Sequence, residues 1–544
     1  MIRLTMQKIK MHIDRMSLTP TRLLLLVAVF LTASGNWSFL DRVTEVYPFN
    51  SNNLGFLVSL TVCFHALVVL LLLVFSLVMT VRLAATVLIV LAAVAGYYAD
   101  SLGVVIDDTM IRNILQTNIN EAADMVNSSL VLHVVLLGLL PVALIWLLPL
   151  QKASFLRELR YKLQTAFAAV LVIVLCVLPL SSHYASFLRG HKSLRYYANP
   201  GYPVYSIGRY INQQIRSRTV HEFTRLAETV TLASPGKRSR LVILVVGETA
   251  RTDHFSLNGY ERETNPLLAQ ESRVISYPRV SSCGTSTAIS VPCMFAHEGR
   301  ERFQPDVAEY KENVLDILSR AGVHVLWRDN NSDSKGVAVR LAFEDYKRPG
   351  INTHCDIECR DTGMLIGLQA YFDNHPGDIL VVLHQMGSHG PAYYKRYPKA
   401  FERFRPTCQS VELSSCTNET IINAYDNSIL YTDYFLSKVI DLLKQNSNRY
   451  ETMMLYLSDH GESLGEAGIY LHGLPYLFAP DAQTQVPVIL WTSESTDIDF
   501  EKTRRLSSQP NSHDVLFSTL LQVFGVQTDL SDNHSPPLLY LTRS

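Results

Sequence analysis

The sequence predicts an N-terminal transmembrane domain of five helices followed by a C-terminal α/β domain with a mostly parallel central sheet. Long apolar runs are concentrated before residue 182 of the 544-residue chain. After Pro235-Gly236, short runs rich in Val, Ile and Leu alternate with helical stretches. Acidic and histidine residues follow directly on some of these short runs, at the edge where α/β sheets gather their ligands.

Five apolar runs are each close to the ~20 residues that cross the ~30 Å of bilayer hydrocarbon. They are residues 22–40, 55–79, 83–106, 129–149 and 163–181. Buried helices of a soluble core are the alternative, but five such runs in succession favour membrane spans. The first run also has the length of a signal peptide. We expect it to be retained, because no small-residue cleavage site stands out and four more spans follow.

Basic residues flank the predicted spans asymmetrically. Lys and Arg precede the first span and join the second to the third and the fourth to the fifth, and such residues mark the cytoplasmic side. The loops 41–54 and 107–128 carry more Asp and Glu. Five spans that begin inside must end outside, which predicts a multi-pass membrane protein with its α/β domain outside the cytoplasm. The basic group Arg189, Lys192 and Arg195 lies on the predicted outer side and argues against this orientation.

Six of the eight cysteines form three close pairs after the membrane region. The pairs are Cys283 with Cys293, Cys355 with Cys359, and Cys408 with Cys416. Disulfides persist in oxidising compartments such as the periplasm, so three short-loop disulfides agree with the predicted orientation. Cys355 and Cys359 could instead belong to a structural zinc site, but no matching second pair exists. Cys63 and Cys176 lie within predicted spans, where we expect them to be small apolar residues.

The segment 182–237 differs in composition from its neighbours, because it gathers five tyrosines around Pro200 and Pro203. Tyrosine favours the membrane–water interface, which predicts a linker with an amphipathic helix on the outer leaflet. An ordinary connecting helix fits as well. The predicted domains are therefore the transmembrane domain 1–181, the linker and interfacial helix 182–237, and the α/β domain 238–544.

Five short apolar runs are the predicted strands of the α/β domain. They are residues 241–246, 323–327, 379–383, 453–457 and 486–491. Helical stretches such as 312–321 and 420–446 lie between them. This alternation is typical of a mostly parallel sheet covered by helices on both faces, with ligands at the carboxyl ends of the strands.

Polar residues at these strand ends form a candidate metal site. Glu248 follows the first predicted strand, and Asp459 with His460 follows the fourth. Carboxylate and imidazole groups are ligands of Zn²⁺. Thr285, directly after Gly284, is a candidate nucleophile, because a bound zinc ion can lower the pKa of a hydroxyl group enough to make it reactive. Taken alone, Thr285 would fit an ordinary helix N-cap.

These motifs together resemble a known family. The five spans are combined with VVGETAR (245–251), SCGTSTAISVPCMF (282–295), MGSHGP (386–391), LSDHGES (457–463) and YLHG (470–473). The combination is similar to the lipid A phosphoethanolamine transferases, which include the transferable colistin-resistance enzymes. The resemblance covers essentially the whole chain. Any one motif alone would indicate only the alkaline phosphatase and sulfatase superfamily, whose fold the α/β domain is expected to share.

The resemblance implies a zinc enzyme with one firmly bound ion and a possible second one. It implies that Glu248, Thr285, Asp459 and His460 ligate the catalytic zinc, with Thr285 also the nucleophile. His389 and His472 would contact the transferred phosphoethanolamine or a second zinc; each alone could be a structural histidine.

The resemblance also implies a binding site for the donor lipid. Lys335 would bind the phosphate, although an isolated lysine is usually only solvated. The positions that match those holding the ethanolamine group are Asn113, Thr117 and Glu121. Their spacing of four residues predicts a common helical face, which without the resemblance would be an ordinary polar loop helix.

The implied reaction is a double displacement. Thr285 attacks phosphatidylethanolamine, diacylglycerol departs, and a lipid A phosphate attacks the phosphoethanolamine-threonine. The added ammonium group would weaken the binding of cationic polymyxin. The expected partners are the donor lipid, a lipid A or lipopolysaccharide acceptor and the membrane, with no nucleic acid, and we expect a monomer.

Alternatives remain at the level of the sequence. The acceptor could be Kdo or a core heptose, and the chain could be a phosphoglycerol transferase or phosphatase of the same superfamily. A sulfatase is disfavoured, because Thr285 stands where the modified Cys or Ser of a sulfatase would be. A non-catalytic membrane scaffold is disfavoured, because all the proposed ligands are present.

Overall fold

The computed structural model describes residues 17–117, 119–151, 154–217, 222–232, 238–530 and 536–542. Contacts divide the chain into two compact units. The first unit comprises Met1–Asp108 and Val126–Arg209, and the second comprises Thr109–Met125 and Tyr210–Ser544. The segment Thr109–Met125 therefore belongs by its contacts to the second unit, although in sequence it lies between two apolar helices of the first.

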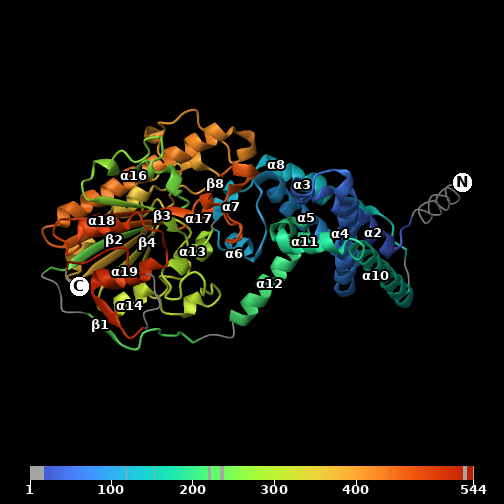
Figure 1. Cartoon of the computed structure of the whole chain (residues 1–544), viewed down its shortest axis with the longest axis horizontal. Helices are drawn as coiled ribbons and strands as arrows, with labels where there is room; N and C mark the ends of the chain where they lie inside the picture. Colours follow the sequence, from blue (N-terminus) through green and yellow to red (C-terminus); the bar gives the residue numbers. More distant parts are fainter. Residues whose placement is uncertain are drawn as a thin grey trace. The chain divides into compact units, whose positions relative to one another are not determined.

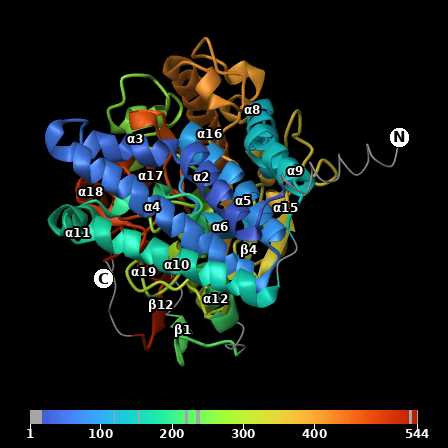
Figure 2. The same ribbon diagram turned by 90° about the vertical axis from the view of Figure 1, so that its right-hand side faces the viewer.

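The first unit is a set of apolar helices, four of which are long enough to cross a membrane within the described residues. They are α4 (Ser51–Val78), α5 (Val81–Leu102), the continuous run of α8 (Ser128–His133), η1 (Val134–Leu139) and α9 (Leu140–Leu147), and α10 (Phe155–Val177). Helices α4 and α10 pack side by side (Figure 2). Large apolar side chains of α10, such as Leu163 and Phe167, remain exposed, as expected of a surface that faces lipid.

The first predicted span is not one straight helix. It is a pair, α2 (Pro20–Ser34) and α3 (Trp37–Val46), bent by 57°, so the described chain has four spans, or five if the pair counts as one. The bend has a polar cause. The side-chain amide of Asn36 donates to the carbonyl groups of Leu31 (2.9 Å) and Asn199 (2.8 Å), and the amide of Asn199 donates to Gly35 O (3.0 Å). These bonds satisfy backbone groups that the break would otherwise leave unpaired.

The second unit is built on an eight-stranded sheet in the order β11-β3-β10-β7-β2-β6-β4-β5 (Figure 1). The strands are β2 (Arg240–Gly247), β3 (Val274–Ser281), β4 (His324–Asp329), β5 (Ala342–Asp345), β6 (Ile379–His384), β7 (Glu451–Ser458), β10 (Gln485–Thr492) and β11 (Asn511–Ser512). Neighbours from β7 to β5 pair in parallel, as do β11 and β3, whereas β10 is antiparallel to both of its neighbours. The sheet is therefore mixed, with antiparallel pairing on both sides of β10 and parallel pairing elsewhere.

The five predicted strands correspond to β2, β4, β6, β7 and β10. Strand β3 was missed because Pro278 lies inside it and proline weakens the sequence signal of a strand. Central strand β2 is buried on both faces: Leu241 and each residue to Val246 are 0–1% exposed. Burying each such side chain contributes roughly 1.5–3 kcal/mol, so the strand that leads to Glu248 is firmly placed.

Helices cover both faces of the sheet. On one face α13 (Thr287–Met294), α14 (Val314–Arg320) and α19 (Val515–Phe524) share a core with the β2 residues Val242, Leu244 and Val246. The long helix α16 (Asn418–Asn446) lies over the opposite face (Figure 1). The remaining elements are α6 (Asp108–Gln116), α7 (Ile119–Asp124), α11 (Ser181–Gly190), α12 (Gly201–Ser217), α15 (Leu368–Asn374), α17 (Asp481–Thr484), α18 (Phe500–Leu506), β1 (Val230–Leu232), β8 (Ser463–Leu464), β9 (Tyr470–Leu471) and β12 (Val526–Thr528).

Candidate active site

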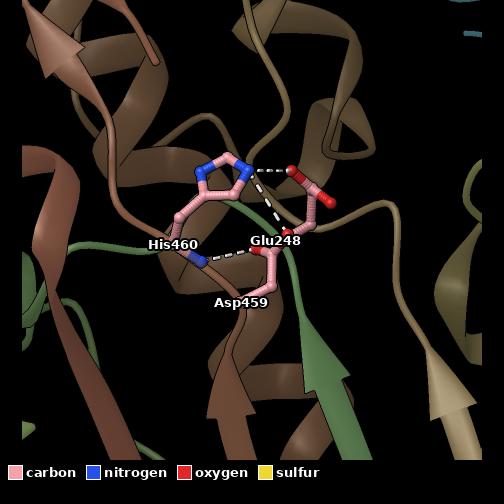
Figure 3. A group of neighbouring side chains, drawn as sticks. All are labelled: Glu248, Asp459 and His460. Carbon is pink, nitrogen blue, oxygen red and sulfur yellow. Dashed lines mark hydrogen bonds and ion pairs between the residues drawn. The ribbon is translucent and has the colours of Figure 1, made fainter. Parts of the chain in front are cut away.

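Three buried side chains meet at the carboxyl ends of two neighbouring parallel strands. Strand β2 leads into Glu248, and β7 leads into Asp459 and His460 (Figure 3). The register of the two strands pairs Gly247 with Ser458, which brings the residues that follow side by side. One ligand atom from each of the three side chains lies within 4.8 Å of the others. All three are at most 1% exposed.

The chemistry of this group fits a metal ion. Nε2 of His460 lies 3.5 Å from Glu248 Oε1 and 3.3 Å from Asp459 Oδ2, and Asp459 Oδ2 has no hydrogen-bond partner within the described chain. Two buried carboxylates require compensating positive charge. Burial lowers the pKa of His460, so its imidazole is neutral near pH 7. With Nδ1 held 2.9 Å from Gly461 O, Nε2 is left to bind a metal such as Zn²⁺.

An asparagine that the sequence analysis did not single out supports Glu248. The Asn331 amide donates to Glu248 Oε2 at 2.7 Å and to Gln385 O at 2.8 Å. Gly387 lies against the backbone of the same glutamate: a Cβ at this glycine would come within 2.8 Å of Glu248 O. Asn331 lies in the motif DNNSDSKG, but its pairing with a residue 83 positions away leaves no local signal in the sequence.

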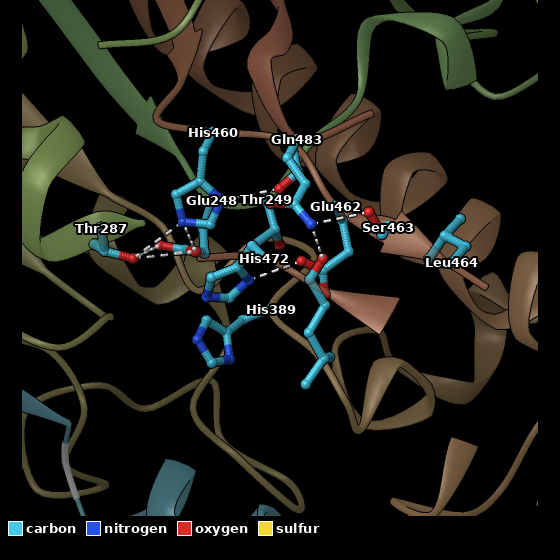
Figure 4. A network of polar contacts seen from close by, with 12 residues as sticks. Glu248, Thr249, Thr287, His389, His460, Glu462, Ser463, Leu464, His472 and Gln483 are labelled. Atoms are coloured by element: carbon cyan, nitrogen blue, oxygen red, sulfur yellow. Dashed lines mark hydrogen bonds and ion pairs between the residues drawn. The ribbon is translucent and has the colours of Figure 1, made fainter. Parts of the chain in front are cut away.

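The hydroxyl group beside these ligands belongs to Thr287, the first residue of α13. Its Oγ1 lies 3.2 Å from Glu248 Oε2 and 3.4 Å from His460 Nε2 (Figure 4). The hydroxyl of Thr285 instead donates to Leu474 O at 2.6 Å. The structure therefore does not support the predicted place of Thr285. The motif SCGTSTA holds two threonines, and the turn into α13 brings the second one to the carboxylates.

Two histidines extend the site beyond the three ligands. The His472 ring lies 4.3 Å from the His460 ring and 5.6 Å from the His389 ring, centroid to centroid (Figure 4). The Nδ1 atom of His472 lies 2.7 Å from Oε2 of the fully buried Glu462, a partner that the sequence analysis missed. Burial, and then the nearby His472 and Arg396, hold the pKa of His389 well below its usual value. The structure thus gathers both predicted histidines at this end of the sheet.

Lys335 has a left-handed backbone, with φ of 50°. Its ammonium group donates to Ser332 O at 2.8 Å and to Gln116 O at 3.1 Å. This left-handed conformation costs roughly 1–2 kcal/mol for a residue other than glycine. The contact with Gln116 brings Lys335 to the end of α6, which is the segment with the predicted ethanolamine-binding residues.

The three residues of that segment do not lie in one continuous helix. Asn113 lies in α6, which ends at Gln116, and α7 begins only at Ile119. Thr117 lies in the break, and its hydroxyl donates to Asn113 O at 2.6 Å. The side chain of Glu121 lies outside the described residues. The break corrects the prediction of a continuous helix, while Asn113 remains 3.9 Å from the Cβ position of Gly473, next to His472.

The three predicted disulfides are present. They join Cys283 to Cys293, Cys355 to Cys359, and Cys408 to Cys416. Cys63 and Cys176 are free, as expected. The first bridge spans the turn into α13, so a covalent bond braces the segment that presents Thr287.

Comparisons with known proteins give matches in both parts of the chain. The family described as phosphoethanolamine transferase EptA/EptB matches residues 64–215, and the sulfatase family matches residues 240–526. The phosphatidylethanolamine transferase Mcr-1 of Escherichia coli is 44% identical over 527 residues, which cover 95% of this chain and 96% of the relative. The chain belongs to the phosphoethanolamine transferase family.

Other members of the phosphoethanolamine transferase family extend the comparison. The phosphoethanolamine transferase EptA of Escherichia coli K12 is 38% identical and covers 96% of both chains. The solved structure of the integral membrane protein lipooligosaccharide phosphoethanolamine transferase A from Neisseria meningitidis superimposes with a TM-score of 0.90 at 33% identity. The match covers 95% of this chain and 98% of that structure, so the membrane helices and the sulfatase-like unit both have a counterpart in a membrane enzyme.

Proposed function

We propose that the chain transfers phosphoethanolamine from phosphatidylethanolamine to a phosphate of lipid A through a covalent intermediate on Thr287. The observation that carries this proposal is the Thr287 hydroxyl, 3.2 Å from Glu248 and 3.4 Å from His460. A relative at 44% identity is named a phosphatidylethanolamine transferase. Added ethanolamine would reduce the negative charge of lipid A and with it the binding of cationic polymyxin.

Glu248, Asp459 and His460 would hold one zinc ion. When bound, zinc supplies positive charge that lowers the pKa of a nearby hydroxyl and offsets the charge of the phosphate. Thr287 begins α13, where the positive end of the helix dipole also stabilises an oxyanion. The choice of Thr287 over Thr285 follows from the hydrogen bond that ties the Thr285 hydroxyl to Leu474 O.

The reaction proceeds in two displacements. The Thr287 oxygen bonds to the phosphorus, the bond from phosphorus to the glycerol oxygen breaks, and diacylglycerol leaves with a proton. We assign this proton transfer to His472, because the carboxylate of Glu462 lies 2.7 Å from its Nδ1 and orients the ring, as in a general acid–base pair. A lipid A phosphate oxygen then attacks the same phosphorus, the bond from phosphorus to Thr287 Oγ1 breaks, and His472 passes the proton released by the incoming phosphate group to Oγ1.

The remaining site residues would hold the donor head group. Lys335 and His389 would contact the phosphate. A second zinc ion held by His389 and His472 is the alternative to these roles of the two histidines. The ethanolamine would lie against the segment that carries Asn113, Thr117 and Glu121. The ethanolamine end of the head group would thus face α6 and α7.

We assign residues 1–181 to the inner membrane, residues 182–237 to a linker with an interfacial helix, and residues 238–544 to a periplasmic catalytic domain. The three disulfides support an oxidising compartment. Both substrates are membrane lipids, so a membrane anchor spares the enzyme from extracting them. We expect a monomer.

Mass spectrometry of lipid A tests the proposal. Cells that express the wild-type chain should gain the mass of phosphoethanolamine on lipid A, and cells that express Thr287→Ala should not. Thr285→Ala is the matched control and should retain the modification, because its hydroxyl is tied to a backbone carbonyl. If the Thr287→Ala cells still modify lipid A, or if only the Thr285→Ala cells lose the modification, Thr287 is not the nucleophile and the original prediction of Thr285 is favoured. Modification of Kdo or heptose alone would identify a different acceptor.

A further inference from the structure

The segment Thr109–Met125, which carries α6 and α7, is held at both ends by ion pairs with the rest of the second unit. Near its start, the buried Arg112 pairs with Asp306. Near its end, Asp124 lies 2.5 Å from Lys395 Nζ and 3.1 Å from Arg396 Nη2. The two anchors bracket the part of the segment that faces Lys335.

Arg396 is the more informative partner, because its guanidinium group has three different contacts. Nε donates to the backbone carbonyl of His389 at 2.5 Å, Nη2 pairs with Asp124, and Nη1 pairs with Glu358. The residue is 4% exposed. A guanidinium presents its donors in a rigid planar fork, so a shift of any one partner changes the geometry available to the other two.

We propose that Arg396 is a positioning residue that couples the docking of the segment Thr109–Met125 to the placement of His389. The proposal rests on the function proposed above, and it adds that the donor site is assembled by docking. When Asp124 reaches Arg396, the guanidinium is held between two carboxylates, and its third donor fixes the loop of His389. When Asp124 is absent, Arg396 turns toward Glu358 and the carbonyl of His389 loses its donor.

Charge explains why this contact is selective for the docked state. Arg396 and Lys395 together face the carboxylates of Asp124 and Glu358. Without Asp124, Lys395 and Arg396 lose a carboxylate partner, while Glu358 is shared between Arg396 and Arg360. Excess positive charge beside the buried Arg396 is unfavourable. Docking of the segment therefore brings the carboxylate of Asp124 to the positive charges of Lys395 and Arg396. Since Lys335 donates to Gln116 O in the same segment, docking also defines where the predicted phosphate-binding lysine lies.

Hydrogen–deuterium exchange of the full-length protein in detergent tests the coupling without any substrate. Asp124→Asn should speed exchange in residues 109–125 and also in residues 386–397. Glu402→Gln is the matched control: it removes a nearby carboxylate that pairs with Lys399 and Arg405 instead of Arg396, and it should leave residues 109–125 and 386–397 as in the wild type. Faster exchange in residues 109–125 alone, or in neither segment, after Asp124→Asn would overturn the proposal.

Kinetics with phosphatidylethanolamine in detergent give a second readout. Asp124→Asn should raise the donor KM more than it lowers kcat, and Arg396→Gln should affect both parameters. The effect of the double variant on kcat/KM should be smaller than the product of the single effects by at least about twofold. Simple multiplication of the two effects would contradict the coupling. Arg396→Lys, which keeps the charge without the fork, should resemble Arg396→Gln; full activity of that variant would also contradict it.

The two readouts separate this inference from the proposed function. If the wild-type chain transfers no phosphoethanolamine, the function fails, while the exchange measurement still reports whether Asp124 and His389 are coupled. If transfer occurs but exchange shows no coupling, only the role of Arg396 is lost.

Discussion

The support that Asn331 gives to Glu248 leads to a quantitative prediction about zinc binding. The Asn331→Ala variant loses the hydrogen bond of 2.7 Å to Glu248 Oε2 and the bond of 2.8 Å to Gln385 O. A hydrogen bond to a charged group contributes about 1.5–3 kcal/mol. Expressed as affinity this is roughly a 10- to 150-fold change, and removal of such supporting partners typically costs about 10- to 100-fold in metal affinity. We therefore expect the zinc Kd to rise by about one to two orders of magnitude.

The assay is competition for zinc between the purified full-length protein and a chromophoric chelator. The matched control is Asn330→Ala, because Asn330 is equally buried and its amide donates to Cys359 O and Asp361 Oδ1 instead. Both variants should lose stability in thermal melting, but only Asn331→Ala should lose zinc affinity. An unchanged zinc Kd in Asn331→Ala, or an equal loss in Asn330→Ala, would refute the reasoning.

Three further predictions concern the second unit. Gly387→Ala should weaken zinc binding and destabilise the fold by more than the roughly 1–2 kcal/mol of a left-handed backbone, because the new Cβ would meet Glu248 O at 2.8 Å. Its control is Gly367→Ala, where φ is 75° and the space around the Cβ position is open, so this variant should show the backbone strain alone. Equal melting temperatures and equal zinc titrations for the two variants would contradict this prediction. Burial lowers the pKa of His513 to about 4, below the ~6.5 of the unfolded chain, so its contribution to stability is present above pH 6.5 and is lost as the pH falls toward 4, by about 3 kcal/mol. Melting of the metal-free protein across this range should show that loss, His513→Gln should flatten it, and an identical slope in the two proteins would exclude His513 as its source. Full reduction of the disulfides should lower the melting temperature, since loss of a native disulfide typically costs about 2–5 kcal/mol, and unchanged melting would show that the bridges add nothing to stability.

Local patterns in the sequence were sufficient to predict several parts of this fold. Buried strands such as β2 and β7 appear as short runs of Val, Ile, Leu and Met, because both of their faces are covered. The candidate metal ligands Glu248 and Asp459 stand directly after such runs, so their convergence followed from the general geometry of α/β sheets. The disulfide pairs were also predictable, because their cysteines are separated by only 10, 4 and 8 positions.

Other features depended on how distant segments pack, and the sequence alone did not reveal them. The bend between α2 and α3 depends on amide contacts between Asn36 and Asn199, and the antiparallel direction of β10 depends on its pairing with β3 and β7. The choice of Thr287 over Thr285 depends on a turn whose direction is set by contacts with the loop after His472.

The sequence by itself determined which segments are apolar helices or buried strands and which residue types stand at the strand ends, because these properties follow from local composition and periodicity. Only the tertiary structure decided which hydroxyl lies beside Glu248 and His460, that Asn331 supports Glu248, and that Asp124 meets Arg396 across 272 residues. Such contacts depend on strand register and on the packing of loops. Both result from many weak interactions between distant parts of the chain, and these interactions leave no periodic pattern in the local sequence.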